Sequence, residues 1–390
     1  MKRIFGTGNE AVTEGAILAG CRVFAGYPIT PATELAENMS RRLPQVGGYY
    51  LQAEDELAAL HICNGASLGG LKAMTATSGP GFILYADALG WALSAETPVV
   101  LLNSQRVGPV SGISGAPGQG EFYLSRYLAQ GGNYESIVLA PNSVQEALTL
   151  TVEAFYLAER FRTPVTLLAD QIVTDGWETI ELPQDETEAT AMGLHFWPRQ
   201  VHPGPDFYPD SDAIDIPPAV LGRGTSAACS DWTPTTRGFD TEDITWHHKH
   251  AFRLIHKILS HRHLIDRAET YRTDDAPEIV LVSYGSVSRV IKSAVDAARL
   301  AGYKVGAIRP ISLWPFQDAL FARPAKYISV ELNWDGQLVR EVKRAAGAGS
   351  QIHFAGKCGE LPSVRELLEL IEAVANDRPL ARRGWELEAW

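Results

Sequence analysis

The sequence has few cysteines, and none of them form a closely spaced pair. The four are Cys21, Cys63, Cys229 and Cys358. Zinc ribbons and protein-bound iron–sulfur clusters need pairs such as CxxC, so we expect no iron–sulfur cluster and no structural zinc in this chain. A disulfide framework is not expected either, which favours a reducing compartment.

Long apolar runs and an excess of basic residues are also missing. No stretch approaches the ~18 apolar residues of a membrane span, and Glu10 and Glu14 interrupt the segment that could act as a signal peptide. The chain has 34 Lys plus Arg against 46 Asp plus Glu, a formal net charge of −12. Because nucleic-acid binding usually needs a basic face, we expect no nucleic-acid partner. Together with the absence of a long apolar run, these features predict a cytoplasmic protein with no membrane span.

What the sequence does contain is an alternation of apolar strands and small-residue helices. Its 390 residues suggest two or three domains. In residues 1–180, segments such as PVVLLN (98–103) are apolar throughout, which is typical of parallel strands buried on both faces. Residues 246–390 repeat the alternation on a smaller scale. We therefore predict an α/β protein whose first domain has a parallel sheet with helices on both faces, followed by a smaller α/β domain.

Residues 181–245 break this alternation. They hold many of the chain's 23 prolines, which exclude long helices and central strands. The segment is predicted to be an interdomain crossover, and the alternative is an ordered loop that shapes a binding site. Its aromatic residues argue against a wholly disordered linker; they include Phe196, Trp197, Phe207, Tyr208 and Trp232.

Three further motifs have simple structural explanations. GTGNEA (6–11) resembles a dinucleotide fingerprint, but no convincing strand precedes it, so the start of a helix is the better interpretation. SYGSVS (283–288) is either a plain strand-to-helix turn or an anion site at a helix N-terminus. Six of the ten histidines fall in 247–263 without an i, i+4 pair, which favours a solvated helix face over a metal site.

The more informative residues follow four successive predicted strands. In a parallel sheet the carboxyl ends of the strands share one edge, where α/β proteins bind ligands. A buried acid at this edge can hydrogen-bond a ligand and an arginine can hold a carboxylate, although acids at a helix start can also simply favour the helix dipole. The residues are Thr30 in GYPITP (26–31), Glu54, Asp55 and Glu56 before a helix of small residues, Ser78 and Gly79 in TSGPG (77–81), and Arg106 in SQRVGP.

These segments and others resemble one family, the α subunit of 2-oxoacid:ferredoxin oxidoreductases. The resemblance covers about 1–180 and 245–375. It implies that 1–180 is the thiamine diphosphate pyrimidine-binding domain of a transketolase-like fold, that 181–245 is the Pro- and aromatic-rich crossover, and that 246–390 contains the transketolase C-terminal-like domain. The motifs are YPITP (27–31), QAEDELAA (52–59), ATSGPG (76–81), NSQRVGP (103–109), APNSVQEA (140–147), IRPISLWPF (308–316) and VELNWDGQLVREV (330–342).

The resemblance also implies roles for the residues at the strand ends. Glu56 matches the glutamate that contacts the aminopyrimidine of the cofactor, and it can donate that hydrogen bond only when it carries a proton. Thr30 and Arg106 match the residues that hold the substrate carboxylate. Ser78 and Gly79 match the turn beside the cofactor. If Glu56 is not the catalytic acid, Glu54 is the next candidate.

The parts of the family pattern that this chain lacks imply partners. The sequence contains no GDG motif for the diphosphate and Mg²⁺, and it lacks the cysteines for a cluster. A β subunit is expected to supply both, with further γ and ferredoxin-like subunits. The implied reaction is oxidative decarboxylation of a 2-oxoacid with coenzyme A to an acyl-CoA and CO₂, with electrons passing to iron–sulfur clusters in partner subunits.

The substrate and one alternative function stay open at this point. The segments VSGISGAPGQG (110–120) and TPTTRG (233–238) depart from the pattern of 2-oxoglutarate enzymes, and the crossover is rich in aromatic residues. An aryl 2-oxoacid such as phenylglyoxylate is therefore expected beside 2-oxoglutarate. A non-catalytic scaffold subunit is the alternative, and retention of Thr30, Glu56 and Arg106 argues against it. A nicotinamide-dependent dehydrogenase is disfavoured because the chain has no proper glycine fingerprint.

Overall fold

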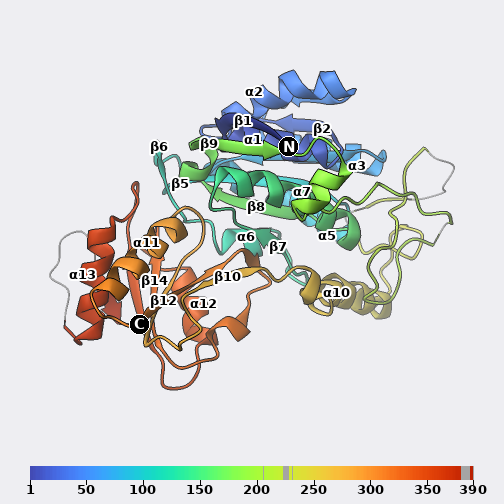
Figure 1. Cartoon of the computed structure of the whole chain (residues 1–390). Helices are drawn as coiled ribbons and strands as arrows, with labels where there is room; N and C mark the ends of the chain where they lie inside the picture. Colours follow the sequence, from blue (N-terminus) through green and yellow to red (C-terminus); the bar gives the residue numbers. More distant parts are fainter. Residues whose placement is uncertain (205, 223–227, 231, 379–386, 390) are drawn as a thin grey trace.

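The first sheet has eight strands, most of them parallel, in the order β13-β7-β8-β5-β4-β2-β3 with β6 paired to β5, and all but β13 come from the first part of the chain (Figure 1). The computed structural model describes residues 1–204, 206–222, 228–230, 232–378 and 387–389. Every residue of β4 and β8 is buried, as expected for strands covered on both faces. The strands are β2 (Cys21–Gly26), β3 (Tyr49–Gln52), β4 (Lys72–Thr77), β5 (Val100–Val107), β6 (Ile113–Pro117), β7 (Ile137–Leu139), β8 (Val165–Asp170) and β13 (Ser312–Trp314).

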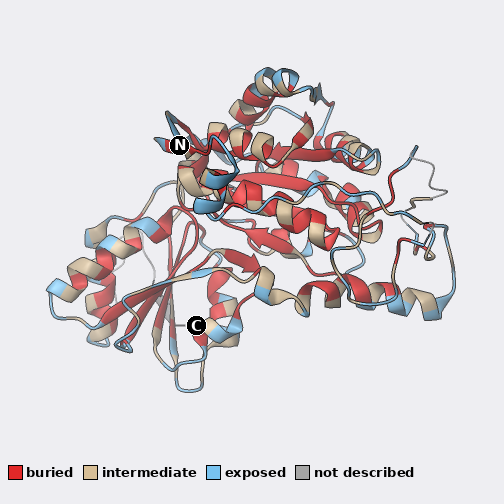
Figure 2. Ribbon diagram, turned by 45° about the vertical axis from the view of Figure 1, so that its right-hand side comes forward, coloured by how far each residue is buried: buried red, intermediate tan, exposed pale blue. Residues whose placement is uncertain are grey.

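Helices cover both faces of this sheet, as predicted, so the strands lie in a buried layer between them (Figure 2). On one face the core is built with α1 (Gly8–Leu18), α2 (Thr33–Arg42) and α7 (Val144–Phe161). On the other face it is built with α3 (Glu56–Leu68), α4 (Pro80–Leu84) and α5 (Ala86–Ser94). Two short helices, α6 (Leu124–Tyr127) and α8 (Gln171–Asp175), lie in the connections.

A separate two-stranded antiparallel ladder joins β1 (Lys2–Thr7) to β9 (Trp177–Leu182). The expectation that no strand precedes GTGNEA was therefore wrong, because β1 pairs outside the main sheet and begins with charged residues. The predicted helix start is confirmed. Thr7 caps α1 by accepting from the Glu10 amide at 3.1 Å, and the Glu10 carboxylate accepts from the Thr7 amide at 3.0 Å.

The crossover runs along the amino ends of the strands, on the right of Figure 1. After the short helix α9 (Glu186–Ala191), its described residues form no further helix or strand before α10 (Ile244–Leu259), apart from one isolated bridge. Lys72, the first residue of β4, donates to the Trp197 carbonyl, and the Tyr208 hydroxyl donates to the Ala95 carbonyl at 2.8 Å, just before β5. The predicted lack of long elements is confirmed.

The second sheet has six strands in the order β10-β12-β11-β14-β15-β16. Its four central strands run parallel and the two edge strands are antiparallel. The strands are β10 (Ala268–Tyr271), β11 (Ile279–Val282), β12 (Val305–Pro310), β14 (Lys326–Glu331), β15 (Gln351–Gly356) and β16 (Leu387–Ala389), and the helices are α11 (Val287–Leu300), α12 (Leu338–Ala345) and α13 (Val364–Ala375).

The two sheets share a hydrophobic core. Helices α11 and α13 cover one face of the second sheet, while the other face packs with α12 against Phe122, Val138 and Leu168 of the first part. Strand β13, from the second part of the sequence, pairs with β7 of the first sheet. Helix α10 also contributes Leu254 and Ile258 to the cores of the first part. In the described part of the chain, no helix is long and apolar enough to cross a membrane.

Candidate active site at the carboxyl ends of four strands

The predicted site residues lie at the carboxyl ends of four neighbouring strands, β5, β4, β2 and β3. This adjacency was the premise of the sequence prediction, and the strand order confirms it. The four strands thus bring to one edge of the sheet residues that are far apart in the sequence. Thr30 follows β2, Glu56 follows β3, Ser78 and Gly79 follow β4, and Arg106 lies at the end of β5.

The three acids before α3 have three different environments. Glu54 is exposed. Asp55 caps the helix, because its Oδ1 accepts from the Ala58 amide at 2.7 Å. Glu56 is only 3% exposed. The capping explanation therefore holds for Asp55, whereas Glu56 is the acid that the fold places inside the site.

Glu56 is held between α3 and the turn after β4. The Thr77 hydroxyl donates to Glu56 Oε1 at 3.0 Å. The backbone of Gly81 lies so close that an added Cβ would sit 2.0 Å from the same oxygen. Only a residue without a side chain leaves the carboxyl group in this position. Thr77 and Gly81 both lie within the TSGPG motif, but the sequence analysis did not single them out.

Arg106 and Thr30 are joined directly. The Arg106 guanidinium donates through Nη1 to the Thr30 carbonyl at 2.7 Å. Arg106 is 6% exposed and Thr30 is exposed. Gly79 has φ 44, and a Cβ there would lie 3.4 Å from Arg106 Nε, so the turn after β4 packs closely against the guanidinium. The structure therefore brings Thr30, Gly79 and Arg106 together, as predicted.

Buried polar atoms of Ser78 and Arg106 lack partners among the described residues. Ser78 Oγ and Arg106 Nε are shielded from solvent and have no hydrogen-bond partner among the described residues. Buried polar groups are nearly always hydrogen-bonded, so each such atom needs an explanation. Bound ligands that accept from these atoms, near the Glu56 carboxyl group, would explain them.

A cavity of about 600 Å³ adjoins this edge, between the β5–β6 hairpin and the loop that follows β14. Gly79, Pro80 and Gly108 contribute to its wall, so it opens beside the turn that holds Arg106. Its other side chains are mainly apolar, with the two acids Glu121 and Asp335, and its described lining includes no lysine or arginine.

The SYGSVS turn does hold an anion at a helix N-terminus, but the anion belongs to the chain itself. Asp170 Oδ2, at the end of β8, accepts from the Ser286 amide at 2.8 Å and from Gln119 Nε2 at 3.3 Å. Burial raises the pKa of Asp170. The turn is therefore structural, and it fastens the second sheet to the first.

In the histidine-rich segment, as elsewhere among the described residues, no group of three potential metal ligands comes together. The expectation of a solvated face was wrong for His250, which is 4% exposed and contacts the Ser94 carbonyl through Nε2 at 3.0 Å. Burial lowers the pKa of His250 to about 4. The reason is that α10 packs against the first part of the chain, which the local pattern did not reveal.

Comparison with known proteins places these features in a family. Residues 14–222, more than half of the chain, match the family model "Pyruvate flavodoxin/ferredoxin oxidoreductase, thiamine diP-bdg", and residues 277–367 match "Pyruvate:ferredoxin oxidoreductase core domain II". The chain is 41% identical to 2-oxoglutarate synthase subunit KorA of Methanocaldococcus jannaschii, over 94% of this chain and 98% of that protein. It is 37% identical to ketoisovalerate oxidoreductase subunit VorB of Methanothermobacter marburgensis, over 95% and 97%.

Solved structures agree with this assignment. A 2-oxoglutarate:ferredoxin oxidoreductase from Magnetococcus marinus, solved with 2-oxoglutarate, coenzyme A and succinyl-CoA bound, superposes with a TM-score of 0.85 at 29% identity. The match covers 95% of this chain and 65% of that one. A split-gene transketolase matches with a TM-score of 0.53 at 8% identity, which supports the transketolase-like fold alone.

Proposed function

The chain belongs to the 2-oxoacid:ferredoxin oxidoreductase family as one subunit of such an enzyme, and from this premise we propose that it is the α subunit and contributes half of the active site. The proposed reaction joins a 2-oxoacid and coenzyme A to give an acyl-CoA and CO₂. The electron pair released passes to iron–sulfur clusters in partner subunits. Whether ferredoxin or NAD takes the electrons finally is a property of those partners.

The observation that carries this proposal is the position of Glu56. It is a buried acid at the carboxyl edge of the sheet, fixed by Thr77 and packed against the backbone of Gly81. A protonated carboxyl group there can donate a hydrogen bond to a ring nitrogen. This arrangement, together with the unpartnered Ser78 hydroxyl, fits the pyrimidine end of thiamine diphosphate. Thiamine diphosphate, when bound, supplies the electron sink for decarboxylation.

Arg106 is proposed to hold the substrate carboxylate. Its Nη1 is engaged by the Thr30 carbonyl, while the buried Nε has no partner among the described residues and can donate to an anion. A guanidinium fixed in this way orients a carboxylate with little loss of side-chain freedom on binding. Thr30, exposed beside it, is proposed to contact the same carboxylate.

A β subunit is proposed to complete the site. The sequence has no GDG motif with which to hold a diphosphate and Mg²⁺. Apolar side chains at this edge are also exposed; Ile83 is 53% exposed, and Leu84, Val110 and Ile113 are exposed as well. Apolar side chains that gather at a surface commonly mark a contact with another protein. We propose that the β subunit covers them and closes the site from this side.

We propose 2-oxoglutarate as the first candidate substrate. Four relatives named 2-oxoglutarate synthase subunit KorA are 36–41% identical along nearly the whole chain. The expectation of an aryl 2-oxoacid rested partly on the aromatic crossover. That part of its support is lost, because the described contacts of Trp197, Phe207 and Tyr208 lie at the amino edge, opposite Arg106.

A branched-chain 2-oxoacid is the second candidate, and one observation favours it. The cavity beside Gly79 has a mainly apolar lining with two acids and, among the described residues, no cation to pair with a second carboxylate. An apolar side chain fits such a lining better than the distal carboxylate of 2-oxoglutarate does. If 2-oxoglutarate is the substrate, the partner subunit is expected to provide the second cation.

The half-site proposal is tested by 2-oxoacid-dependent viologen reduction with added thiamine diphosphate, Mg²⁺ and coenzyme A. The chain purified alone should be inactive and the native complex active. In the complex, Glu56→Gln should lower kcat at least ~100-fold, which corresponds to ~3 kcal/mol of transition-state stabilisation. Glutamine preserves size and an oxygen for Thr77, so assembly should be unchanged.

Glu54→Gln is the matched control, because Glu54 is an exposed acid two residues from Glu56. Its activity should equal that of the wild type. Loss of activity in the Glu54 variant alone would mean that the wrong acid was chosen. Full activity in both variants would identify the chain as a scaffold subunit, and turnover by the isolated chain would rule out a half-site.

The substrate is decided by comparing kcat/KM of the complex for 2-oxoglutarate, 2-oxoisovalerate, pyruvate and phenylglyoxylate. We expect 2-oxoglutarate to lead. A lead for 2-oxoisovalerate would assign the apolar cavity as the side-chain pocket, and a lead for phenylglyoxylate would restore the aryl hypothesis. Changes at Arg106 should impair all four, because the carboxylate beside the keto group is common to them.

A further inference from the structure

The wall of the cavity beside Gly79 contains one buried acid. Glu121 follows the β5–β6 hairpin, is 8% exposed and lines this cavity of about 600 Å³. The other acid of the described wall, Asp335, is exposed, so solvent and salt screen its charge. Charges interact more strongly where water is excluded. Glu121 is therefore the acid of this chain that can influence which charges the cavity accepts.

The fold holds Glu121 close to the proposed carboxylate anchor, Arg106. Gln105, which directly precedes Arg106 on β5, donates through Nε2 to Glu121 Oε2 at 2.9 Å. Strand β6 returns along β5, so that Pro117 is the partner of Arg106 in the ladder. Gly79 packs against Arg106 and belongs to the wall of the same cavity. The anchor and the acid thus border one region of the site.

The cavity suits the side chain of a 2-oxoacid. Its volume, about 600 Å³, lies within the range of ~300–1,000 Å³ that is usual for small-molecule pockets. Apolar side chains such as Ile83, Leu124 and Leu332 form much of its wall. Glu121 is the only buried carboxyl group in the described wall, which contains no lysine or arginine. An apolar side chain finds a matching surface here, whereas a second carboxylate meets Glu121 without a described cation beside it.

The charge of Glu121 depends on pH. Burial raises the pKa of its carboxyl group and Asp335 adds to the increase, while the hydrogen bond from Gln105 and the charge of Arg106 act in the opposite direction. Tyr284 also interacts with Glu121, and burial raises the pKa of its hydroxyl, so Tyr284 stays neutral. As the pH rises through the raised pKa of Glu121, the cavity wall gains a negative charge. At lower pH the protonated carboxyl group can donate a hydrogen bond.

We propose that Glu121 determines which 2-oxoacid side chains the active site accepts. As a carboxylate it disfavours a second carboxylate and leaves apolar side chains unaffected, and in its protonated form it admits a dicarboxylic substrate. Specificity is a difference between affinities, and repulsion of the unwanted ligand is a common way to create it. The inference rests on the proposed function and adds the residue that selects the substrate. A cation from the partner subunit would act on the same distal carboxylate with the opposite sign.

The first test measures kcat/KM of the native complex for 2-oxoglutarate and for 2-oxoisovalerate over a range of pH. The readout is the quotient of the two values, 2-oxoglutarate over 2-oxoisovalerate. Ionisation of Glu56 or of coenzyme A affects both substrates and therefore cancels in the quotient. Carboxylic acids with a pKa of ~4 stay ionised from about pH 5.5 to about pH 8.5, so a change in the quotient over this range comes from the protein. The quotient should fall as the pH rises, because ionised Glu121 repels the distal carboxylate.

The second test repeats these measurements with Glu121→Gln, which removes the charge and keeps an oxygen for the amide of Gln105. At about pH 8 its quotient should exceed that of the wild type at least ~10-fold, because like charges repel strongly at the reduced dielectric of a buried site. Its quotient should also change little with pH. Glu341→Gln is the matched control, because Glu341 is 12% exposed and accepts from the Tyr123 hydroxyl at 3.1 Å but does not belong to the described cavity wall. The control should follow the wild type at every pH.

The outcomes separate this inference from the proposed function. Turnover of both substrates with the same quotient in the wild type and in Glu121→Gln at every pH would overturn the role of Glu121 and leave the proposed function standing. A quotient that falls with pH equally in both proteins would assign the selection to the partner subunit, and would overturn it too. Absence of turnover of any 2-oxoacid by the wild-type complex would overturn the proposed function itself. If Glu121→Gln does not assemble, the wild-type series decides, and a quotient independent of pH contradicts the inference.

Discussion

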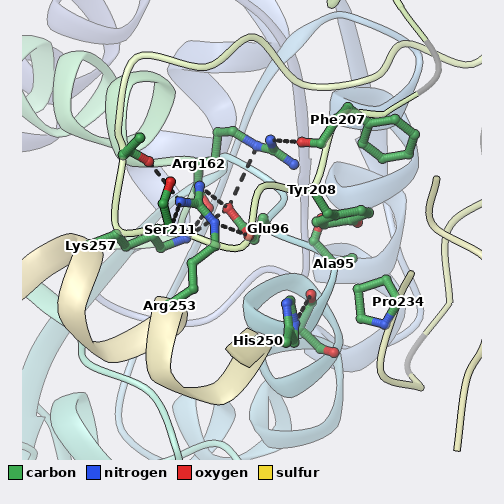
Figure 3. Close-up of polar contacts among 12 residues, drawn as sticks. Ala95, Glu96, Arg162, Phe207, Tyr208, Ser211, Pro234, His250, Arg253 and Lys257 are labelled. Carbon is green, nitrogen blue, oxygen red and sulfur yellow. Dashed lines mark hydrogen bonds and ion pairs between the residues drawn. The ribbon is translucent and has the colours of Figure 1, made fainter. Parts of the chain in front are cut away.

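Replacing Glu96 with glutamine is expected to destabilise the chain strongly. The substitution removes the only described carboxylate that pairs with Arg162, Arg253 and Lys257, and leaves these buried cations facing one another (Figure 3). Breaking a buried ion pair by removing one partner costs ~3–5 kcal/mol. For a chain of this size we take ~2 °C per kcal/mol, so the melting temperature should fall by ~6–10 °C.

The assay is thermal unfolding of the full chain followed by circular dichroism, with hydrogen exchange to locate the effect. Exchange should increase first in α10, which carries Arg253 and Lys257. Glu181→Gln is the matched control, because Glu181 pairs with Arg3 at 2.6 Å on the surface. Exposed ion pairs contribute at most ~1 kcal/mol, so the control should melt within ~2 °C of the wild type.

The reasoning about Glu96 would be refuted if its glutamine variant melted as the control does. Burial alone would raise the pKa of Glu96, but the charges of Lys257, Arg253 and Arg162 outweigh it and hold the pKa well below its usual range. The stabilisation by Glu96 is therefore present at neutral pH and is lost only as the pH falls through that low pKa. The loss of stability of the wild type in strong acid should therefore be larger than that of Glu96→Gln.

Three further predictions concern other parts of the chain. Burial lowers the pKa of Lys257 from 10.5 to about 7, so between these pH values the unfolded chain binds more protons than the folded chain. The melting temperature of the wild type should therefore rise from pH 7 to pH 9 relative to that of Lys257→Met. The same change of melting temperature with pH in both proteins would contradict this. Gly81→Ala should displace the Glu56 carboxyl group, because the added Cβ would lie 2.0 Å from its Oε1. The kcat/KM of the complex should fall at least ~10-fold with little change in melting temperature. Normal activity would show that this close packing is not needed. Asp170→Ala leaves the Ser286 amide without its acceptor and should cost ~1–3 kcal/mol in unfolding experiments; an unchanged melting temperature would show that this contact does not join the sheets.

The features that could be predicted from the sequence are those set by local patterns. A helix of small residues after the three acids and an apolar strand at 98–103 were predicted, and the structure has α3 at Glu56–Leu68 and β5 at Val100–Val107, because composition and periodicity decide such elements. The shared edge was also predictable, since parallel strands that alternate with helices place all their carboxyl ends together. From the sequence alone, however, Glu54, Asp55 and Glu56 are nearly equivalent. The close approach of Gly81 and Thr77, from a different strand end, distinguishes Glu56.

The features that could not be predicted depend on contacts between distant segments. His250 lies on a helix with several other histidines, and nothing local indicates that this one is buried against the Ser94 carbonyl. The same holds for the crossover, whose aromatic residues suggested a substrate pocket. Its path is fixed by Lys72, Ala95 and Arg162, which lie at or just before the amino ends of strands of the first sheet. The aromatic residues do pack against the first sheet, but the composition of a long loop does not show at which edge of a sheet the loop lies.

The two edges of the first sheet are built under opposite requirements. At the carboxyl edge, Ser78 and Arg106 keep buried polar atoms without partners among the described residues, and Gly81 leaves no side chain over Glu56. This arrangement costs stability unless something binds there. At the amino edge, Arg253 and Lys257 use their charge to hold the crossover and α10 on the sheet. Because the anchor lies at the far end of the strands, a partner subunit can cover the carboxyl edge without disturbing it. Changes in the crossover should therefore act mainly on stability, and changes at the carboxyl edge mainly on catalysis.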